Sequence, residues 1–208
     1  YLLNDVRKYI RNEHFVGFTR LIRLLATQIG SLMNINELSR ECGLKYAVCE
    51  SYIHLLQHMY IIRMIEPMSI NKRKTISQMK KVYFYDLGLR NIVYNSFNEV
   101  DFRTDKGALF ENEVMLELWR NLSSGETLQF YRTLNGTEVD FVIDGHIRKL
   151  LVECKFQNYH KPMRLQAITN LASDLSDSNT RCFIANLNYY STDSIIYMMP
   201  CYWCDRIQ

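Results

Sequence analysis

The segment Glu138–Phe156, EVDFVIDGHIRKLLVECKF, is the most informative about the fold of the second half of the chain. Residues alternate between two faces in EVDFVID and again in LLVECKF. Each segment therefore has one apolar face and one face that mixes charged with aliphatic side chains. This alternation is typical of β-strands, which we expect over residues 138–144 and 150–156.

We expect the two strands to form an antiparallel pair. The register that brings their charged faces together pairs Asp140 with Glu153, Glu138 with Lys155 and Val142 with Leu151. It needs a connecting loop of about six residues around Gly145. The Asp144-Gly145 pair also suits a tight two-residue turn, which would move Asp140 away from Glu153, so both connections stay open.

Residues 107–122, GALFENEVMLELWRNL, have the periodicity of a helix. When successive residues are placed about 100° apart, Glu111 lies at the centre of the apolar arc. Glu113, Glu117 and Arg120 lie on the opposite side. Because a carboxylate aimed into a core is costly unless it is paired, hydrogen-bonded or bound to a metal, Glu111 needs a partner.

Four residues are candidates for catalysis: Glu111, Asp140, Glu153 and Lys155. Asp140, Glu153 and the backbone carbonyl of Cys154 offer hard oxygen ligands to Mg²⁺ or Mn²⁺. Lys155 can orient or deprotonate an attacking water and neutralise developing charge. The pattern favours metal-assisted phosphodiester hydrolysis. The alternative is an ion pair of Glu138 with Lys155, with Asp140 and Glu153 as mere edge residues.

Charge divides the chain into two halves. Of the formal net charge of +3, residues 1–98 contribute +7, from 14 Lys and Arg against 7 Asp and Glu. Residues 99–208 contribute −4, from 11 basic against 15 acidic residues. We expect two modules, the first suited to a polyanion. With 48% hydrophobic and 23% charged residues, fibrous and disordered classes are excluded.

The sequence predicts a location in the cytoplasm. No apolar run is long enough to span a membrane, and no signal peptide is visible. The six cysteines are too few and too scattered for a disulfide framework, so we expect them to be reduced.

The basic half predicts a winged helix-turn-helix. We expect helices over residues 15–29, 34–42 and 45–59, the second beginning at Asn34 with Glu37 three residues later. Two β-rich runs, at 60–65 and 81–85, flank a polar hairpin tip at 69–80.

Cations on this module could contact nucleic-acid phosphates. The third helix carries Lys45, and the hairpin carries the others: Lys72, Arg73, Lys74, Lys80 and Lys81. The alternative is that the charge run is a solvated loop and that the module docks a protein.

Several motifs together resemble the C-terminal region of a large bacterial and archaeal family of AAA-type ATPases. The motifs are GALFEN at 107–112, EVDFVI at 138–143, VECK at 152–155, YLLNDVRKY at 1–9, the helix-turn-helix around 36–56 and KVYFYDLGLRN at 81–91. The resemblance implies an N-terminal P-loop ATPase domain, a winged helix and a nuclease-like domain of the PD-(D/E)XK type. Because the chain has no GxxxxGK[ST], we expect a C-terminal fragment whose ATP site lies in the missing domain.

The resemblance also implies the domain plan. Residues 1–14 would be a remnant of the ATPase lid or linker, 15–98 the winged helix, and 99–208 the nuclease-like domain. That domain would be α/β, with a mixed central sheet flanked by helices. We expect further strands at 128–132, 181–185 and 195–199 and a helix at 163–175.

In that superfamily the helix acid matches Glu111, the first metal ligand matches Asp140, and the acid and lysine of the ExK strand match Glu153 and Lys155. Val139 stands where the motif name has proline. The expected function is a DNA-associated module of the ATPase with a possible Mg²⁺-dependent nuclease site. Its expected partners are DNA and the ATPase domain, with no membrane. Two other hypotheses remain, a catalytically inactive regulatory module that binds nucleic acid or protein, and a purely structural lid.

Overall fold

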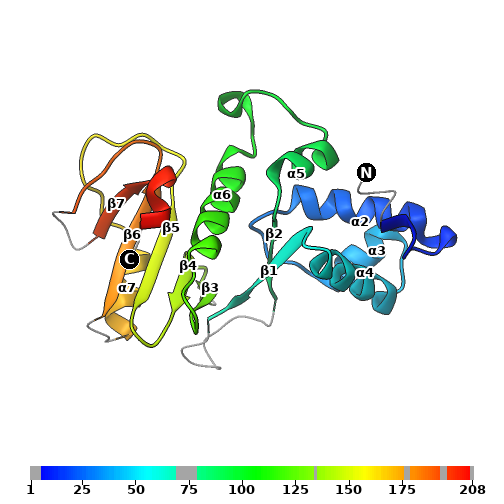
Figure 1. Cartoon of the computed structure of the whole chain (residues 1–208), viewed down its shortest axis with the longest axis horizontal. Coiled ribbons are helices and arrows are strands. Elements are labelled where there is room, and N and C mark those ends of the chain that lie inside the picture. The colour runs from blue at the N-terminus through cyan, green and yellow to red at the C-terminus, as the bar shows by residue number, and fades with distance from the viewer. Residues whose placement is uncertain (1–5, 69–78, 134, 176–178, 193–195, 207–208) are drawn as a thin grey trace. The chain divides into compact units, whose positions relative to one another are not determined.

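The computed structural model describes residues 6–68, 79–133, 135–175, 179–192 and 196–206 (Figure 1). The chain divides into two compact units. The first comprises residues 1–64 and 81–98, and the second comprises residues 65–80 and 99–208.

The first unit consists of short helices followed by a strand pair. Its elements are η1 (Asn12–His14), α2 (Phe15–Thr27), α3 (Ile35–Cys42), α4 (Tyr46–His58), β1 (Ile62–Pro67), β2 (Lys81–Phe84) and α5 (Leu87–Tyr94). From Ile65 onward, β1 belongs to the second unit. The three predicted helices and both predicted strands are confirmed, with bounds that differ by one to two residues.

Local chemistry explains where α3 begins and ends. The side chain of Asn34 accepts hydrogen bonds from the backbone N–H groups of Asn36 and Glu37, which satisfies two donors of the first turn. The helix ends at Gly43, whose φ of 67° suits a residue without a Cβ. The predicted start of this helix is therefore confirmed.

The core of the first unit lies between the helices. The apolar stripe of α2, with Phe18, Leu21 and Leu25, is fully buried. Arg90 on α5 is also fully buried, and its Nε donates to the backbone oxygen of Ala26 at 2.8 Å. This bond satisfies one donor of a charged group inside the core and ties α5 to the end of α2.

The second unit is a sheet with helices. Its elements are η2 (Val100–Phe102), α6 (Lys106–Arg120), β3 (Thr127–Arg132), β4 (Glu138–Asp144), β5 (Lys149–Cys154), α7 (Gln166–Leu175), β6 (Thr180–Asn186), β7 (Ile196–Pro200) and η3 (Cys201–Arg206). The predicted strands and helices of this half are confirmed.

The described strands hydrogen-bond in the order β2-β1-β3-β4-β5-β6-β7. β4 is antiparallel to β3 and β5, whereas β6 is parallel to β5 and β7. The second half of β1 runs parallel to β3 through Glu66 and Pro67. The predicted mixed α/β class is therefore confirmed.

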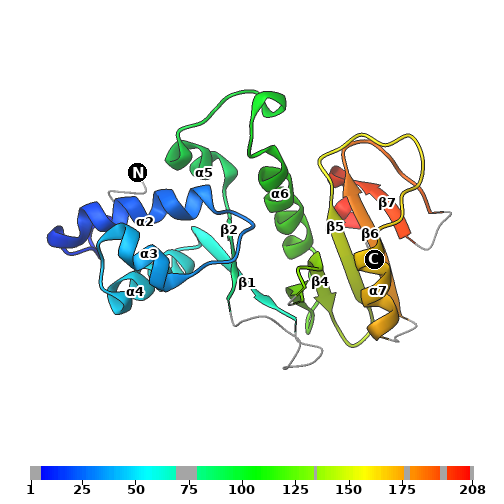
Figure 2. The same ribbon diagram turned by 180° about the vertical axis from the view of Figure 1, so that it is seen from behind.

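The two faces of the sheet pack against different helices. α7 covers the face that carries Val142, Leu151 and Ile184 (Figure 2). Because successive side chains of a strand point to opposite faces, Leu150 and Val152 face the other way, and α6 contacts β5. Among the described residues, no helix has both the length and the apolar character needed to cross a membrane.

Candidate functional site

The predicted register between β4 and β5 is confirmed. Val142 pairs with Leu151, and the described pairing runs from Asp144 with Lys149 to Phe141 with Val152. The connecting loop has four residues, Gly145–Arg148, so it is shorter than the six predicted and longer than a two-residue turn. Its ends are joined by a hydrogen bond from the backbone N–H of Gly145 to the oxygen of Arg148.

Asp140 lies where β4 and β5 stop pairing. Its Oδ2 accepts a 2.7 Å hydrogen bond from the backbone N–H of Cys154. On the other edge of β4, the pairing with β3 shifts between Gln129 with Val142 and Tyr131 with Val139. One extra residue of β4 is therefore accommodated at Asp140 or Phe141. Such β-bulges re-aim a side chain and are common beside active sites.

Glu153 and Lys155 form an ion pair at the end of β5. Nζ of Lys155 donates to Oε1 of Glu153 at 2.8 Å. The side chain of Glu153 is 13% exposed, whereas that of Lys155 is 36% exposed. Oε2 of Glu153 is buried and has no hydrogen-bond partner among the described residues.

The charge state of Lys155 follows from its neighbours. Burial lowers the pKa of Lys155, but the hydrogen bond to Glu153 and the negative charges of Glu153 and Asp140 outweigh this effect. The pKa is therefore raised, and the ammonium is protonated at neutral pH. This charge state favours orienting and charge-neutralising roles over the predicted alternative of deprotonating water.

Glu111 lies on α6, the helix that contacts β5. The helix is buried around most of its circumference, through Leu109, Phe110, Asn112, Val114, Met115, Leu116 and Leu118. Glu111 itself is half-buried. It is thus neither in the centre of the core, as the helical arc predicted, nor fully exposed.

The charges of three acids act on the thiol of Cys154. Burial, followed by the negative charges of Asp140, Glu111 and Glu153, raises the pKa of Cys154 well above its ordinary value. All three carboxylates are therefore close enough to the thiol for their charges to disfavour the thiolate. Residues from α6, β4 and β5, far apart in the chain, are thereby brought together.

The alternative ion pair of Glu138 with Lys155 is contradicted. Glu138 pairs with Arg132 of β3, with 3.0 Å between Nη1 of Arg132 and Oε2 of Glu138. Lys155 pairs with Glu153 instead, because β5 ends at Cys154 and the strands have already parted there.

The donor set for a metal is small. Among the described residues, no group of three or more His, Cys, Asp or Glu side chains is placed to hold a metal ion. The predicted ligands are two carboxylates, Asp140 and Glu153, and the backbone carbonyl of Cys154. The orphaned Oε2 of Glu153 fits such a cation, because Mg²⁺ accepts a few protein oxygens and keeps several waters.

The predicted phosphate-binding cations have different surroundings. Lys72, Arg73 and Lys74 lie outside the described residues. Lys45 is exposed at the start of α4, and Lys80 pairs with Glu66 at 2.6 Å. Lys81 is buried, with 2% exposure, which argues against its predicted contact with phosphate.

One further side chain lies in this neighbourhood. Tyr159, in the loop after β5, has a buried hydroxyl without a hydrogen-bond partner among the described residues. Burial raises the pKa of Tyr159, and the positive charge of Lys155 opposes the shift, which places the two groups within electrostatic reach. Sequence reasoning did not identify Tyr159 as a site residue. The chain has 14 tyrosines, so the only signal in the sequence was its position four residues after Lys155.

Comparisons with known proteins extend over both halves. Residues 106–204 match DUF4143, a domain of unknown function. DUF4143 is found in proteins associated with AAA-type ATPases. The DUF4143 match includes Glu111, Asp140, Glu153, Lys155 and Tyr159. Residues 1–99 match DUF8612, a second domain of unknown function.

An uncharacterized protein of the archaeon Methanocaldococcus jannaschii is similar to most of the chain. The two are 30% identical over 187 residues, which cover 88% of this chain and 40% of that protein. The chain thus spans 40% of the length of this relative. No solved structure matches the chain.

Proposed function

We propose that the DUF4143 region is a nuclease-like module that binds a nucleic-acid phosphodiester through a divalent cation and Lys155, and hydrolyses it. In this proposal the PD-(D/E)XK assignment applies to the second unit. The chain would be the C-terminal part of an AAA-type ATPase, with the ATP site in a preceding domain. The association of DUF4143 with AAA-type ATPases supports this placement.

The unpartnered Oε2 of Glu153 carries the proposal. A buried carboxylate oxygen without a hydrogen bond is costly, and a cation would remove that cost. Asp140 lies beside it at the point where β4 and β5 separate, which supplies a second hard oxygen donor. Asp140 and Glu153 are the two acids that the sequence pattern predicts as metal ligands.

The other residues suit the same reaction. When bound, Mg²⁺ or Mn²⁺ would polarise the scissile phosphate. The Lys155 ammonium, held at 2.8 Å from Glu153, would neutralise charge that develops on the phosphate and orient the attacking water. The negative charge of Glu111 on α6 would favour the binding of a cation.

We propose that the first unit is a winged helix that brings nucleic acid to this site. The exposed residues Ala47, Ser51, His54 and His58 follow one side of α4, and Lys45 is exposed at its start. The side is polar and weakly charged, so it supports phosphate contact better than base-specific readout.

A catalytically inactive module is the second candidate. The ion pair of Lys155 with Glu153 and the small donor set among the described side chains favour it. Such a module would bind nucleic acid or protein and regulate the ATPase without cutting.

Cation binding and cleavage test the proposal. Mn²⁺ affinity is measured by isothermal titration calorimetry, and cleavage is followed on labelled single-stranded and double-stranded DNA and RNA with Mn²⁺ or Mg²⁺. We expect cleavage by the native chain and none by Asp140→Asn, Glu153→Gln or Lys155→Ala. Glu138→Gln, on the same strand but paired with Arg132, is the matched control and should retain activity.

The outcomes separate the two candidates. Mn²⁺ binding that Glu153→Gln abolishes, together with cleavage, supports the nuclease. Nucleic-acid binding without cleavage under any of these conditions would favour the inactive module. Cleavage that survives in Asp140→Asn and Glu153→Gln would overturn the assignment of these residues.

A further inference from the structure

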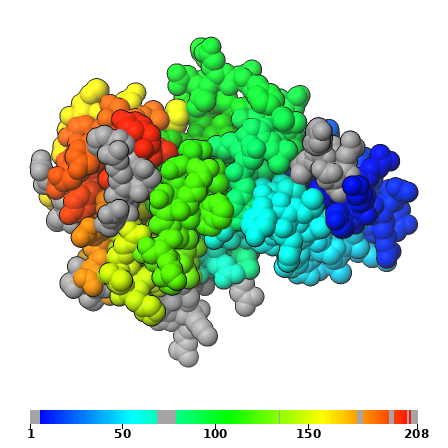
Figure 3. All heavy atoms as spheres, in the orientation of Figure 1, coloured from blue at the N-terminus to red at the C-terminus, as the bar shows by residue number. Residues whose placement is uncertain are grey.

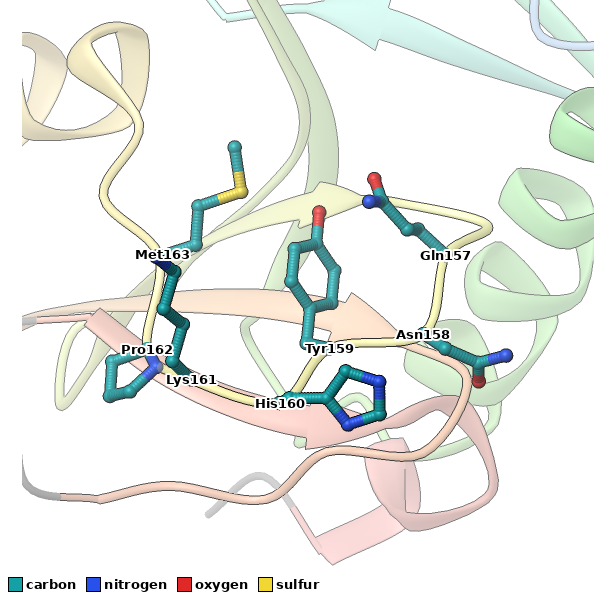
Figure 4. A pocket seen from close by; sticks show the side chains of 7 residues that line it. All are labelled: Gln157, Asn158, Tyr159, His160, Lys161, Pro162 and Met163. Atoms are coloured by element: carbon teal, nitrogen blue, oxygen red, sulfur yellow. The ribbon is translucent and has the colours of Figure 1, made fainter.

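A pocket of about 430 Å³ lies in the loop that follows β5 (Figure 4). Residues 157–163 line it, so its first residue comes two positions after Lys155. This loop is at the surface of the second unit (yellow in Figure 3), and Gln157, His160 and Lys161 are exposed. The pocket thus begins beside the candidate site and is open to a ligand.

The loop is held in place from the β6–β7 connection. The backbone N–H of Tyr159 donates to Oδ1 of Asn188 at 2.9 Å, and Nδ2 of Asn188 donates to the oxygen of Tyr159 at 3.2 Å. Asn188 in turn donates its backbone N–H to the fully buried Asn186. The pocket is therefore formed in advance, which lowers the entropic cost of binding.

Tyr159 provides an unsatisfied polar group in this wall. The residue is 9% exposed, and its hydroxyl has no hydrogen-bond partner among the described residues. The ring stands between Gln157 and Met163, and the hydroxyl points the same way as the ends of those two side chains (Figure 4). A ligand that enters between them would meet one buried hydroxyl and one exposed amide.

We propose that this pocket binds a nucleobase, the one next to the phosphate held at Glu153 and Lys155, with the Tyr159 hydroxyl as its hydrogen-bond partner. This inference rests on the proposed phosphodiester site, from which the pocket is separated by a single residue of chain, Phe156.

The lining fits a nucleobase better than a charged group alone. A base has apolar faces and a polar edge, and here Pro162 and Met163 offer apolar contact while Tyr159 and Gln157 offer polar atoms. The exposed ammonium of Lys161 adds positive charge at the rim, which suits the sugar-phosphate backbone. The volume accommodates a single nucleoside and not a stacked duplex.

Two probes that share a phosphate and differ by the base test the proposal. They are 2′-deoxyadenosine 5′-monophosphate and 2-deoxyribose 5-phosphate, titrated calorimetrically into the full chain with Mg²⁺. We expect the native chain to bind the nucleotide at least about tenfold more tightly than the sugar phosphate, because contacts with the base add binding free energy. Tyr159→Phe should weaken nucleotide binding about fivefold and leave sugar-phosphate binding unchanged, because only the hydroxyl is lost.

Further variants keep the test independent of folding. Tyr131→Phe removes a hydroxyl from a tyrosine that packs against the same core but lies outside the pocket, and it should change neither affinity. Gln157→Ala alters an exposed wall residue and should weaken nucleotide binding alone. Equal affinities of the native chain for both probes, or an equal loss for both probes in Tyr159→Phe and Gln157→Ala, would overturn the nucleobase pocket.

Lys155→Ala separates this proposal from the proposed function. We expect it to weaken both probes equally, because it removes a phosphate contact. If Lys155→Ala changes neither affinity while Tyr159→Phe still weakens the nucleotide alone, the phosphate site fails and the nucleobase pocket stands. If Lys155→Ala weakens the binding of both probes, and the native chain binds the nucleotide no more tightly than the sugar phosphate, the phosphate site stands and the pocket proposal fails.

Discussion

Oδ2 of Asp140 accepts a 2.7 Å hydrogen bond from the backbone N–H of Cys154, just beyond the last paired residues of β4 and β5. The carboxylate thus satisfies a backbone donor where the strands separate, and it also lies beside Glu153 and Lys155. One side chain has a structural and a proposed chemical role, and different substitutions separate the two.

Asp140→Ala should destabilise the chain by about 1–3 kcal/mol, because it leaves the backbone N–H of Cys154 without its partner. Asp140→Asn keeps an acceptor oxygen and should cost less than about 1 kcal/mol, while still weakening cation binding. Urea unfolding followed by circular dichroism measures both. A loss of stability in Asp140→Asn as large as that in Asp140→Ala would contradict the role of the hydrogen bond.

A divalent cation should stabilise the native chain through Glu153. At a free Mn²⁺ concentration of about 100 times Kd, the expected gain is about 2.7 kcal/mol, seen as a rise in Tm by differential scanning calorimetry. Glu153→Gln should abolish this rise because it removes the carboxylate with the orphaned oxygen. The rise should persist in Glu117→Gln, an acid of α6 that pairs with Arg120. An equal rise in Glu153→Gln would place the cation elsewhere.

The pair of Glu126 with Arg148 should make stability depend on pH in the acid range. Its distances are 2.6 and 3.0 Å, and the Glu126 side chain is 7% exposed. The hydrogen bond from Arg148 lowers the pKa of Glu126 from the ordinary 4.5. The stabilisation is therefore complete above about pH 4.5 and is lost as the pH falls through the lowered pKa.

Glu126→Gln should cost about 1–3 kcal/mol at pH 7 and reduce the loss of stability between neutral and acid pH. Urea unfolding at a series of pH values gives both quantities. Asp144→Asn, which disturbs the more exposed pair with Lys149, should cost less than about 1 kcal/mol. A pH profile in Glu126→Gln identical to that of the native chain would show that the pair is not responsible.

The N-terminal cap of α3 should be worth about 1 kcal/mol. Asn34→Ala removes the acceptor for two backbone N–H groups and should destabilise the first unit by about that amount. Asn36→Ala, two residues later and exposed within the helix, should be neutral or slightly stabilising because alanine favours helix. Thermal unfolding of both variants checks the difference, and equal effects would mean that the cap contributes nothing.

The sequence predicted the elements well where a single periodicity applied. The alternation of residues 138–144 and 150–156 predicted which faces of β4 and β5 are apolar and excluded a slip by one residue, which would turn every apolar side chain of a strand to the wrong face. It did not choose between the two connections, which the structure settled with a loop of four residues. The same period was less informative for α6. That helix is buried around most of its circumference, so the apolar arc did not locate Glu111 correctly.

Ion pairs at the strand ends were harder to predict than the strands. The register placed Glu138 opposite Lys155, yet Glu138 bonds Arg132 on the other neighbouring strand, and Lys155 turns to Glu153. A polar or charged side chain in a sheet has partners on both sides and on its own strand. Local spacing therefore does not choose among them. The burial of Lys81 likewise depends on packing of the first unit and not on its place in a charge run.

The order and type of the elements and the candidate acids follow from the sequence alone, because side-chain periodicity within short segments encodes them. Tertiary packing was needed to show that the charges of Glu111, Asp140 and Glu153 act on one thiol. It was also needed to show that Asp140 accepts a backbone hydrogen bond where the strands separate. The same is true of the unpartnered hydroxyl of Tyr159 beside Lys155. These relationships join residues from different elements, so they arise from the packing of helix, strands and loop together, which no local pattern encodes.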